Sequence, residues 1–126
     1  MTDDEVIQIS FDHFAGLFPK TCPCCGRCFA TFREYVLASK PVGVAISYDA
    51  EVAAWKPAQP IGAFALANCP CGSTLTVTTE GIPLPEIHLM LEWMRVETER
   101  RGVNPSELLE HVRDEVRKRA LAEPDH

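Results

Sequence analysis

Basic residues are scarce in this sequence, and long apolar runs are missing. The 126 residues include 12 lysines and arginines against 18 aspartates and glutamates, a formal net charge of −6 at pH 7. Nucleic-acid binding requires cations that neutralise phosphates, so nucleic acid is not an expected partner. No apolar run reaches the roughly 18 residues of a membrane-spanning helix, and Met1–Glu5 is acidic where a secretory signal is basic. We therefore expect a cytoplasmic protein without a membrane partner.

Catalytic motifs are missing as well. The sequence contains no phosphate-binding glycine loop, no HExxH and no GxSxG, so we predict that the protein is not an enzyme. His13 is an alternative metal ligand or base, but a single histidine in an apolar stretch is usually packed. His88 and His111 fall on predicted helices, where we expect them at the surface. Asp49 and Glu51 have a spacing that an acid and a base can use, although a solvated edge explains them equally well.

Cysteine, by contrast, is abundant. Disulfides persist in oxidising compartments, and nothing at the N-terminus directs the chain to one. We therefore expect reduced thiolates that bind a metal ion. The six cysteines form two short clusters, which are Cys22, Cys24, Cys25 and Cys28 in the first and Cys69 and Cys71 in the second.

Both clusters have features of metal-binding turns. In residues 22–26, CPCCG, the outer cysteines have the CxxC separation, the proline fixes one backbone angle and the glycine lets the turn bend. In residues 69–72, CPCG, two cysteines lie one residue apart. Zinc prefers four tetrahedral ligands, and two turns that each give two thiolates satisfy this geometry.

These two segments resemble the zinc-ribbon and rubredoxin-like families, in which a CPxCG knuckle faces a second cysteine pair in a β-hairpin turn. They are also similar to small bacterial zinc-binding proteins with CPxCG and a later CGTTL-like turn, matched here by CGSTL at 71–75. The resemblance implies one metal ion held by four thiolates, with Cys22 and Cys25 as one ligand pair and Cys69 and Cys71 as the other. The second pair departs from the families, which usually have CxxC there.

Six cysteines exceed the four positions of one tetrahedral ion. We prefer Cys22 with Cys25, because proline and glycine flank this pair. Cys25 with Cys28 and Cys22 with Cys24 are substitute pairings, and a two-metal cluster of all six is a further alternative. We interpret Cys28, followed by Phe29, as a small buried residue, and Cys24 as pointing outward from the turn.

Zinc is the favoured ion, with iron as the alternative, because four thiolates also hold a single iron. A complete thiolate shell leaves no open coordination position, which is typical of a structural site. The leading hypothesis is a non-enzymatic zinc protein that acts through protein interaction, either with a partner or by self-association through its C-terminal helices. The alternatives are a redox-responsive switch that uses the extra thiols, a rubredoxin-like electron carrier and, against the acidic balance, a nucleic-acid-binding ribbon.

Residues 1–82 predict a zinc-binding, β-rich half. Val6–Phe11 alternates in the manner of a first strand. Thr31 followed by Glu34 makes a capping-box start for a short helix. Between the later strands, Asp49–Pro60 is interpreted as a loop whose Trp55 packs on the core. The composition predicts strands over 42–48, 61–67 and 74–79, which places the second cysteine pair in a hairpin turn.

Residues 83–122 predict two helices, packed on the first half or on a partner. Gly102 ends the first helix, and Asn104 caps the second, with Pro105 at its first position. The apolar stripe of the first contains Ile87, Met90, Leu91 and Met94, widened by Leu89 and Trp93, and that of the second contains Leu109, Val112 and Val116. The pairs Asp114–Lys118 and Glu115–Arg119 indicate a solvated outer face.

The expected fold is therefore α+β. A small antiparallel zinc-ribbon-like half with one short helix is followed by a C-terminal helical hairpin. Residues 123–126 complete the chain as a flexible tail, and we expect one domain overall.

Overall fold

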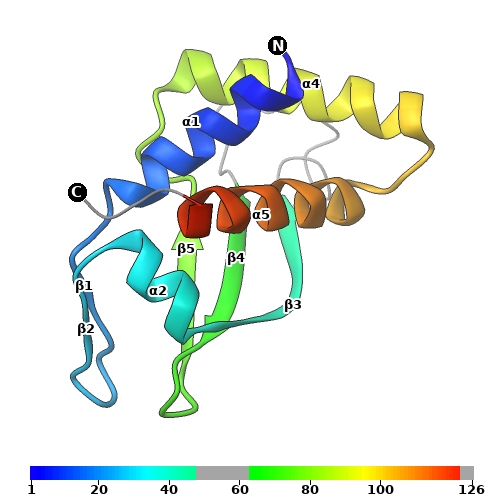
Figure 1. Ribbon diagram of the computed structural model, residues 1–126. Helices are drawn as coiled ribbons and strands as arrows, with labels where there is room; N and C mark the ends of the chain where they lie inside the picture. The colour runs from blue at the N-terminus through cyan, green and yellow to red at the C-terminus, as the bar shows by residue number, and fades with distance from the viewer. Residues whose placement is uncertain (48–62, 123–126) are drawn as a thin grey trace.

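A computed structural model describes residues 1–47 and 63–122 (Figure 1). It confirms the α+β class. The predicted Asp49–Pro60 loop with Trp55, the candidates Asp49 and Glu51, and the tail 123–126 lie outside the described residues. The elements are α1 (Asp3–Ala15), β1 (Lys20–Thr21), β2 (Cys28–Phe29), α2 (Phe32–Ala38), β3 (Lys40–Ser47), β4 (Ala63–Asn68), β5 (Thr74–Thr78), α4 (Leu84–Arg101) and α5 (Pro105–Ala122).

The strands form two antiparallel sheets. β1 and β2 make a short hairpin, and β3, β4 and β5 form a three-stranded sheet in that order. Along β4, Asn68 faces Lys40 on one side and Thr74 on the other. The register of β3 shifts between Val42 and Ile46, a bulge that contains Gly43 at φ 63°. Strands are therefore confirmed in the three predicted ranges, with β4 and β5 as the predicted hairpin.

The first element is a helix, so the predicted strand at 6–11 is wrong. Thr2 starts α1 with a capping box, in which its hydroxyl accepts from the Glu5 amide at 3.2 Å and the Glu5 carboxylate accepts from the Thr2 amide at 3.3 Å. Acidic residues in the first turn also favour the positive end of the helix dipole. Val6, Ile7 and Ser10 are buried. Their spacing places them on one face of a helix, which the alternation of the short apolar run did not indicate.

The predicted short helix is present as α2. Thr31 caps it by accepting from the Glu34 amide at 3.1 Å, while the Glu34 carboxylate accepts from the Ala30 amide at 2.6 Å rather than from the capping residue. Phe32 and Tyr35 pack with their rings 6.2 Å apart. The helix therefore contributes its aromatic face to the core.

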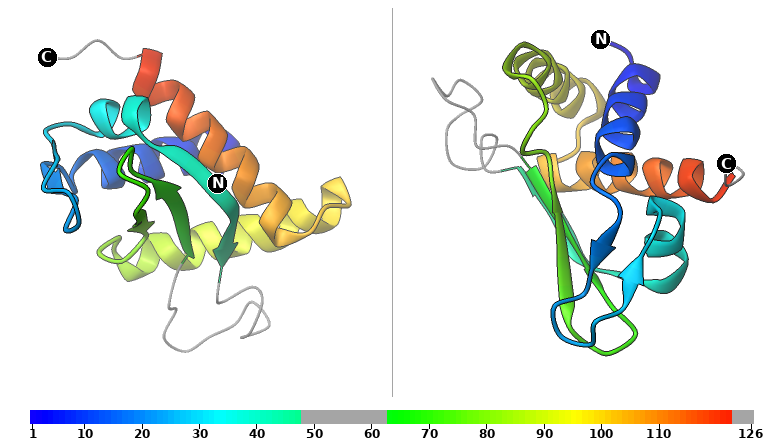
Figure 2. Two further views of the ribbon diagram at one scale, coloured as in Figure 1. Left: turned by 90° about the horizontal axis from the view of Figure 1, so that it is seen from below. Right: turned by 90° about the vertical axis from the view of Figure 1, so that its left-hand side faces the viewer.

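Helix α5 lies at the centre of the fold. It contacts β3, α1, α2 and α4, and Figure 2 shows it running along the sheet beside α1 and α2. Its buried face contains Leu108, Val112, Val116 and Ala120, whereas the predicted Leu109 is only half-buried. Because the buried residues are four positions apart, they form one continuous apolar stripe along the helix.

The charged side of α5 is largely solvated, as the sequence predicted, with Asp114 and Lys118 exposed. Its ion pairs differ from the predicted ones. Arg119 pairs with Asp4 of α1 at 2.8 Å instead of Glu115. Lys118 pairs with Glu115 at 3.3 Å rather than with Asp114, among the residues that the structure describes. Arg119 therefore helps to fasten α5 to α1.

Helix α4 buries Leu91, Trp93, Met94 and Thr98. Leu89 is 56% exposed and lies outside the buried stripe, so its predicted place there is wrong. Gly102 ends the helix at φ 67°, as predicted, in the left-handed conformation that glycine adopts without strain. In the described part of the chain, no helix has the length and apolar content to span a membrane.

Asp3 links the first helix to α4. Its carboxylate accepts from Trp93 Nε1 at 3.3 Å and forms an ion pair with Arg101. The Arg101 hydrogen bond holds the pKa of Asp3 below its usual value of 3.8. α1 and α4 are thereby joined by a charge-assisted contact at the surface.

We expect Leu108→Ala to destabilise the protein by about 2–4 kcal/mol, because Leu108 is 2% exposed and its removal leaves a cavity in the core. Leu121→Ala on the same helix is the matched control, since Leu121 is 42% exposed and its loss should cost less than about 0.5 kcal/mol. Urea unfolding measures both values. Equal effects of the two substitutions would contradict the central position of α5.

Candidate metal centre

Two hairpin loops meet at one end of the molecule. The first joins β1 to β2, the second joins β4 to β5, and both lie at the lower end of Figure 1 and come together in the right-hand view of Figure 2. Lys20 Nζ donates to the Thr76 carbonyl at 3.2 Å, a contact that links the two hairpins. The fold thus places the two cysteine clusters side by side.

The first loop turns tightly around Cys22. Its amide donates to the Arg27 carbonyl at 2.9 Å, and its carbonyl accepts from the Gly26 amide at 3.0 Å. Gly26 has φ 76°, a backbone conformation that residues with a side chain rarely adopt. The CPxCG motif therefore closes the loop with Cys22 and Cys25 on its inner side.

The second loop has a similar closure with one residue fewer between its cysteines. The Cys69 amide donates to the Ser73 carbonyl at 2.9 Å, and the Gly72 amide donates to the Cys69 carbonyl at 2.8 Å. Gly72 has φ 97°. The glycine that follows the CxC pair therefore reverses the chain, and the two cysteines lie within one tight turn.

The sulfur atoms of Cys22, Cys25, Cys69 and Cys71 lie within 4.8 Å of one another. The Cys22–Cys71 and Cys25–Cys69 sulfur pairs are 3.8 Å and 3.7 Å apart. A tetrahedral ion with metal–sulfur bonds of about 2.3 Å places its ligands about 3.8 Å apart. The four-sulfur group therefore fits one metal ion.

Each loop contributes one buried and one exposed cysteine to the four-sulfur group. Cys22 and Cys69 are buried in the core cluster, whereas Cys25 and Cys71 are exposed. The site lies at the boundary between the core and the solvent. Its inner half is fixed by packing, and its outer half by the turns.

The pKa values of the thiols in this group are shifted in opposite directions. The Ser73 hydroxyl and the amides of Cys25 and Cys24 lower the pKa of Cys22 to about 6. The Cys71 amide favours a thiolate at Cys69, but burial and the neighbouring cysteine sulfurs outweigh it and raise the pKa of Cys69 to about 12. Four thiolates so close together repel one another, and a bound cation would remove this conflict.

Ser73 is a part of the site that the sequence did not predict. Its Oγ lies 3.2 Å from the Cys22 sulfur and 3.0 Å from the Cys71 sulfur. The Ser73 hydrogen bond is also the main reason that the pKa of Cys71 is lowered. The sequence shows only that a serine follows Cys71 two residues later. The fold is needed to show that its hydroxyl also contacts Cys22 in the other loop.

The two remaining cysteines lie outside the sulfur group. Cys24 is exposed, as expected for the variable position of the turn. Cys28 is exposed too, so its interpretation as a buried residue is wrong. β2 alternates its side chains, and Phe29 takes the inward position instead.

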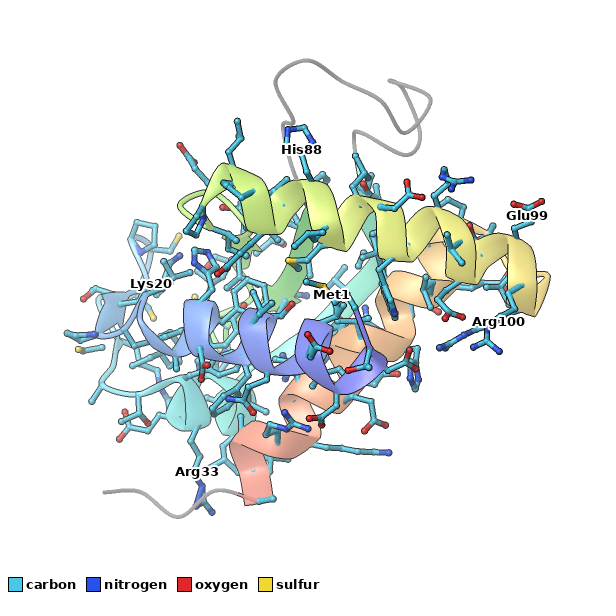
Figure 3. The ribbon with its side chains drawn as sticks, turned by 90° about the horizontal axis from the view of Figure 1, so that it is seen from above. Met1, Lys20, Arg33, His88, Glu99 and Arg100 are labelled. Atoms are coloured by element: carbon cyan, nitrogen blue, oxygen red, sulfur yellow. The ribbon has the colours of Figure 1, made fainter. Side chains whose placement is uncertain are left out.

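None of the histidines in the described residues joins the group. His13 Nε2 lies 2.9 Å from the Thr78 carbonyl, which ties α1 to β5. His88 points away from the body of the molecule on the outer side of α4 (Figure 3), and His111 is exposed. These positions agree with packing and surface roles.

Comparisons of the chain with protein-family models, with curated proteins and with solved structures find no match. The four-sulfur geometry is therefore the observation from which a function has to be argued.

Proposed function

We propose that this chain is a zinc-binding protein in which Cys22, Cys25, Cys69 and Cys71 hold one ion in a structural site. This proposal is supported by the convergence of four sulfurs from two loops to within 4.8 Å of one another. A structural zinc ion supplies folding free energy, because the unfolded chain has no preformed site. The ion would join the β1–β2 hairpin to the β4–β5 hairpin.

The donor set favours a non-enzymatic role. Four protein thiolates complete a tetrahedral shell and leave no position for water or a substrate. The same set also suits a single iron, which makes electron transfer the alternative chemistry. We choose zinc because Zn²⁺ is redox-inactive, which suits a site whose Cys25 and Cys71 are exposed to solvent. Action through a protein partner remains a prediction.

Protein purified without added metal should contain about one zinc ion per chain by elemental analysis. Cys25→Ser and Cys71→Ser should lose the ion, and because both residues are exposed, the loss cannot be a core-packing defect. Free zinc at about 1,000 times the dissociation constant should raise the free energy of unfolding by about 4 kcal/mol.

Cys24→Ser and Cys28→Ser are the matched controls, since neither sulfur belongs to the group. Both should keep zinc at the unsubstituted level. Metal retention by Cys25→Ser, or metal-free protein as stable as the purified form, would refute the structural site. A coloured, iron-containing preparation would replace zinc with iron.

Ser73→Ala should weaken zinc binding by about tenfold, because groups that hydrogen-bond to metal ligands typically contribute 10- to 100-fold in affinity. Competition with a chromophoric chelator measures the change. Thr76→Val is the control, as Thr76 is an exposed side chain of the same hairpin. An unchanged affinity in Ser73→Ala would mean that its hydroxyl has no role once the ion is bound.

A redox-responsive switch is the second candidate, favoured by the exposure of Cys24 and Cys28 beside the ligands. Peroxide would convert one of these thiols to a sulfenic acid and water, and a ligand thiol would then displace water to form a disulfide. The loss of that ligand would release zinc.

Mild peroxide should therefore release zinc faster from the unsubstituted protein than from the Cys24→Ser/Cys28→Ser double variant. A zinc-sensitive dye follows the release. Equal rates in the two proteins would rule out the switch and leave the structural site as the sole candidate.

A further inference from the structure

The core contains a cavity of about 110 Å³ between the sheet and the helices. Its lining comes from α1, α2, α4, α5 and all three strands of the larger sheet, and Figure 2 shows how these helices enclose one side of that sheet. Most of the lining is apolar, including Val6, Leu66, Leu91 and Val112. An apolar space of this size departs from the close packing of protein interiors and is a candidate ligand site.

One member of the lining is an arginine that forms no ion pair within the described residues. Arg117 Nη2 donates to the Val36 and Ser39 carbonyls at 3.0 Å and 2.9 Å. Burial lowers the pKa of Arg117, and the more distant Asp114 carboxylate, which pairs with Arg113, offsets only part of that change. A partly buried cation without an anion is costly, and a bound anion would offset that cost.

Tyr35 supplies the second polar group of the lining. It is 1% exposed, and no partner meets hydrogen-bond geometry at its hydroxyl in the described structure. Burial raises the pKa of Tyr35, and the nearby Arg117 and Ser39 side chains counter part of that rise. The neighbouring Ser39 hydroxyl donates instead to the Tyr35 backbone carbonyl. Buried hydroxyls are nearly always paired, so an unpaired phenol beside a cavity indicates a missing acceptor. A carboxylate accepts from both a phenol and a guanidinium.

We propose that this cavity binds a small aliphatic carboxylate, with its alkyl part against the apolar lining and its carboxylate bound by Arg117 and Tyr35. The volume sets the size. A cavity of about 150 Å³ holds the six carbons of benzene, so 110 Å³ suits an alkyl part of about four carbons. The site is separate from the four-sulfur group and does not rest on the bound ion.

Isovalerate is the probe, titrated into the full chain while backbone amide resonances are followed by NMR. Saturable shifts are expected at residues of the lining, with a dissociation constant of about 1 mM or lower, since very small ligands bind efficiently per atom. Isovaleramide has the same shape without the charge and should bind at least about tenfold more weakly, because hydrogen bonds to charged groups are the stronger ones. Acetate, which lacks the alkyl part, should not saturate.

Two substitutions and one control separate the parts of the proposal. Arg117→Met should remove the preference for isovalerate over isovaleramide, whereas Arg119→Met should keep it, because Arg119 lies on the same helix but outside the lining. Ala45→Leu fills the cavity and should block both probes.

The absence of saturable shifts up to about 20 mM isovalerate would overturn the proposal, as would equal binding of acid and amide. Binding that survives in a folded Ala45→Leu variant would place the ligand elsewhere and overturn it too. Should Arg117→Met fail to fold, the comparison of acid with amide on the unsubstituted chain decides the question alone.

Discussion

The convergence of four sulfur atoms between two hairpins is the constraint on which the lower end of this structure depends. Cys22 and Cys71 are 49 residues apart in the sequence, and their sulfurs are 3.8 Å apart in space. Backbone hydrogen bonds within each loop fix the cysteines locally, but between the loops the described contacts are few. They include the Lys20 side chain on Thr76 and the hydroxyl of Ser73 between the sulfurs. One ion bound to all four sulfurs would join these loops far more strongly than either contact.

The upper part of the fold is held together by different means. Apolar residues of α5 pack against the sheet and three helices, and polar ties then fix the helices relative to one another. Arg119 reaches α1, Arg117 reaches the end of α2, and Asp3 connects α1 with α4. Exposed ion pairs contribute little individually, so the apolar packing supplies most of the stability here. The arrangement of the helices therefore rests mainly on apolar packing rather than on ion pairs.

The sequence predicted well what short segments determine by themselves. The spacing of proline, glycine and cysteine indicated the turns. Gly102 marked the end of α4 and Asn104 the start of α5. The Asn104 side chain accepts from the Glu107 amide at 2.8 Å. The predicted strand at 6–11 is wrong, because the Thr2 and Glu5 capping box ahead of this apolar run starts a helix there. The predicted burial of Cys28 is wrong because side chains alternate along β2, and the alternation turns Phe29 inward and Cys28 outward.

Long-range features could not be read from local patterns. Ser73 meets two cysteines only because two distant hairpins lie side by side, and Arg117 lines a cavity only because α2, α5 and the sheet enclose it. Both depend on tertiary contacts that no segment encodes alone.

The four-sulfur group and the cavity share a physical connection through the aromatic core. Phe29 follows Cys28 directly and packs edge-on against Tyr35, with ring centroids 5.6 Å apart. Tyr35 in turn lines the cavity, so the β1–β2 hairpin supports one of its walls. Buried rings transmit displacement because interiors are densely packed. The position of the first hairpin, which a bound ion would fix, therefore bears on the shape of the cavity without any contact between the two sites.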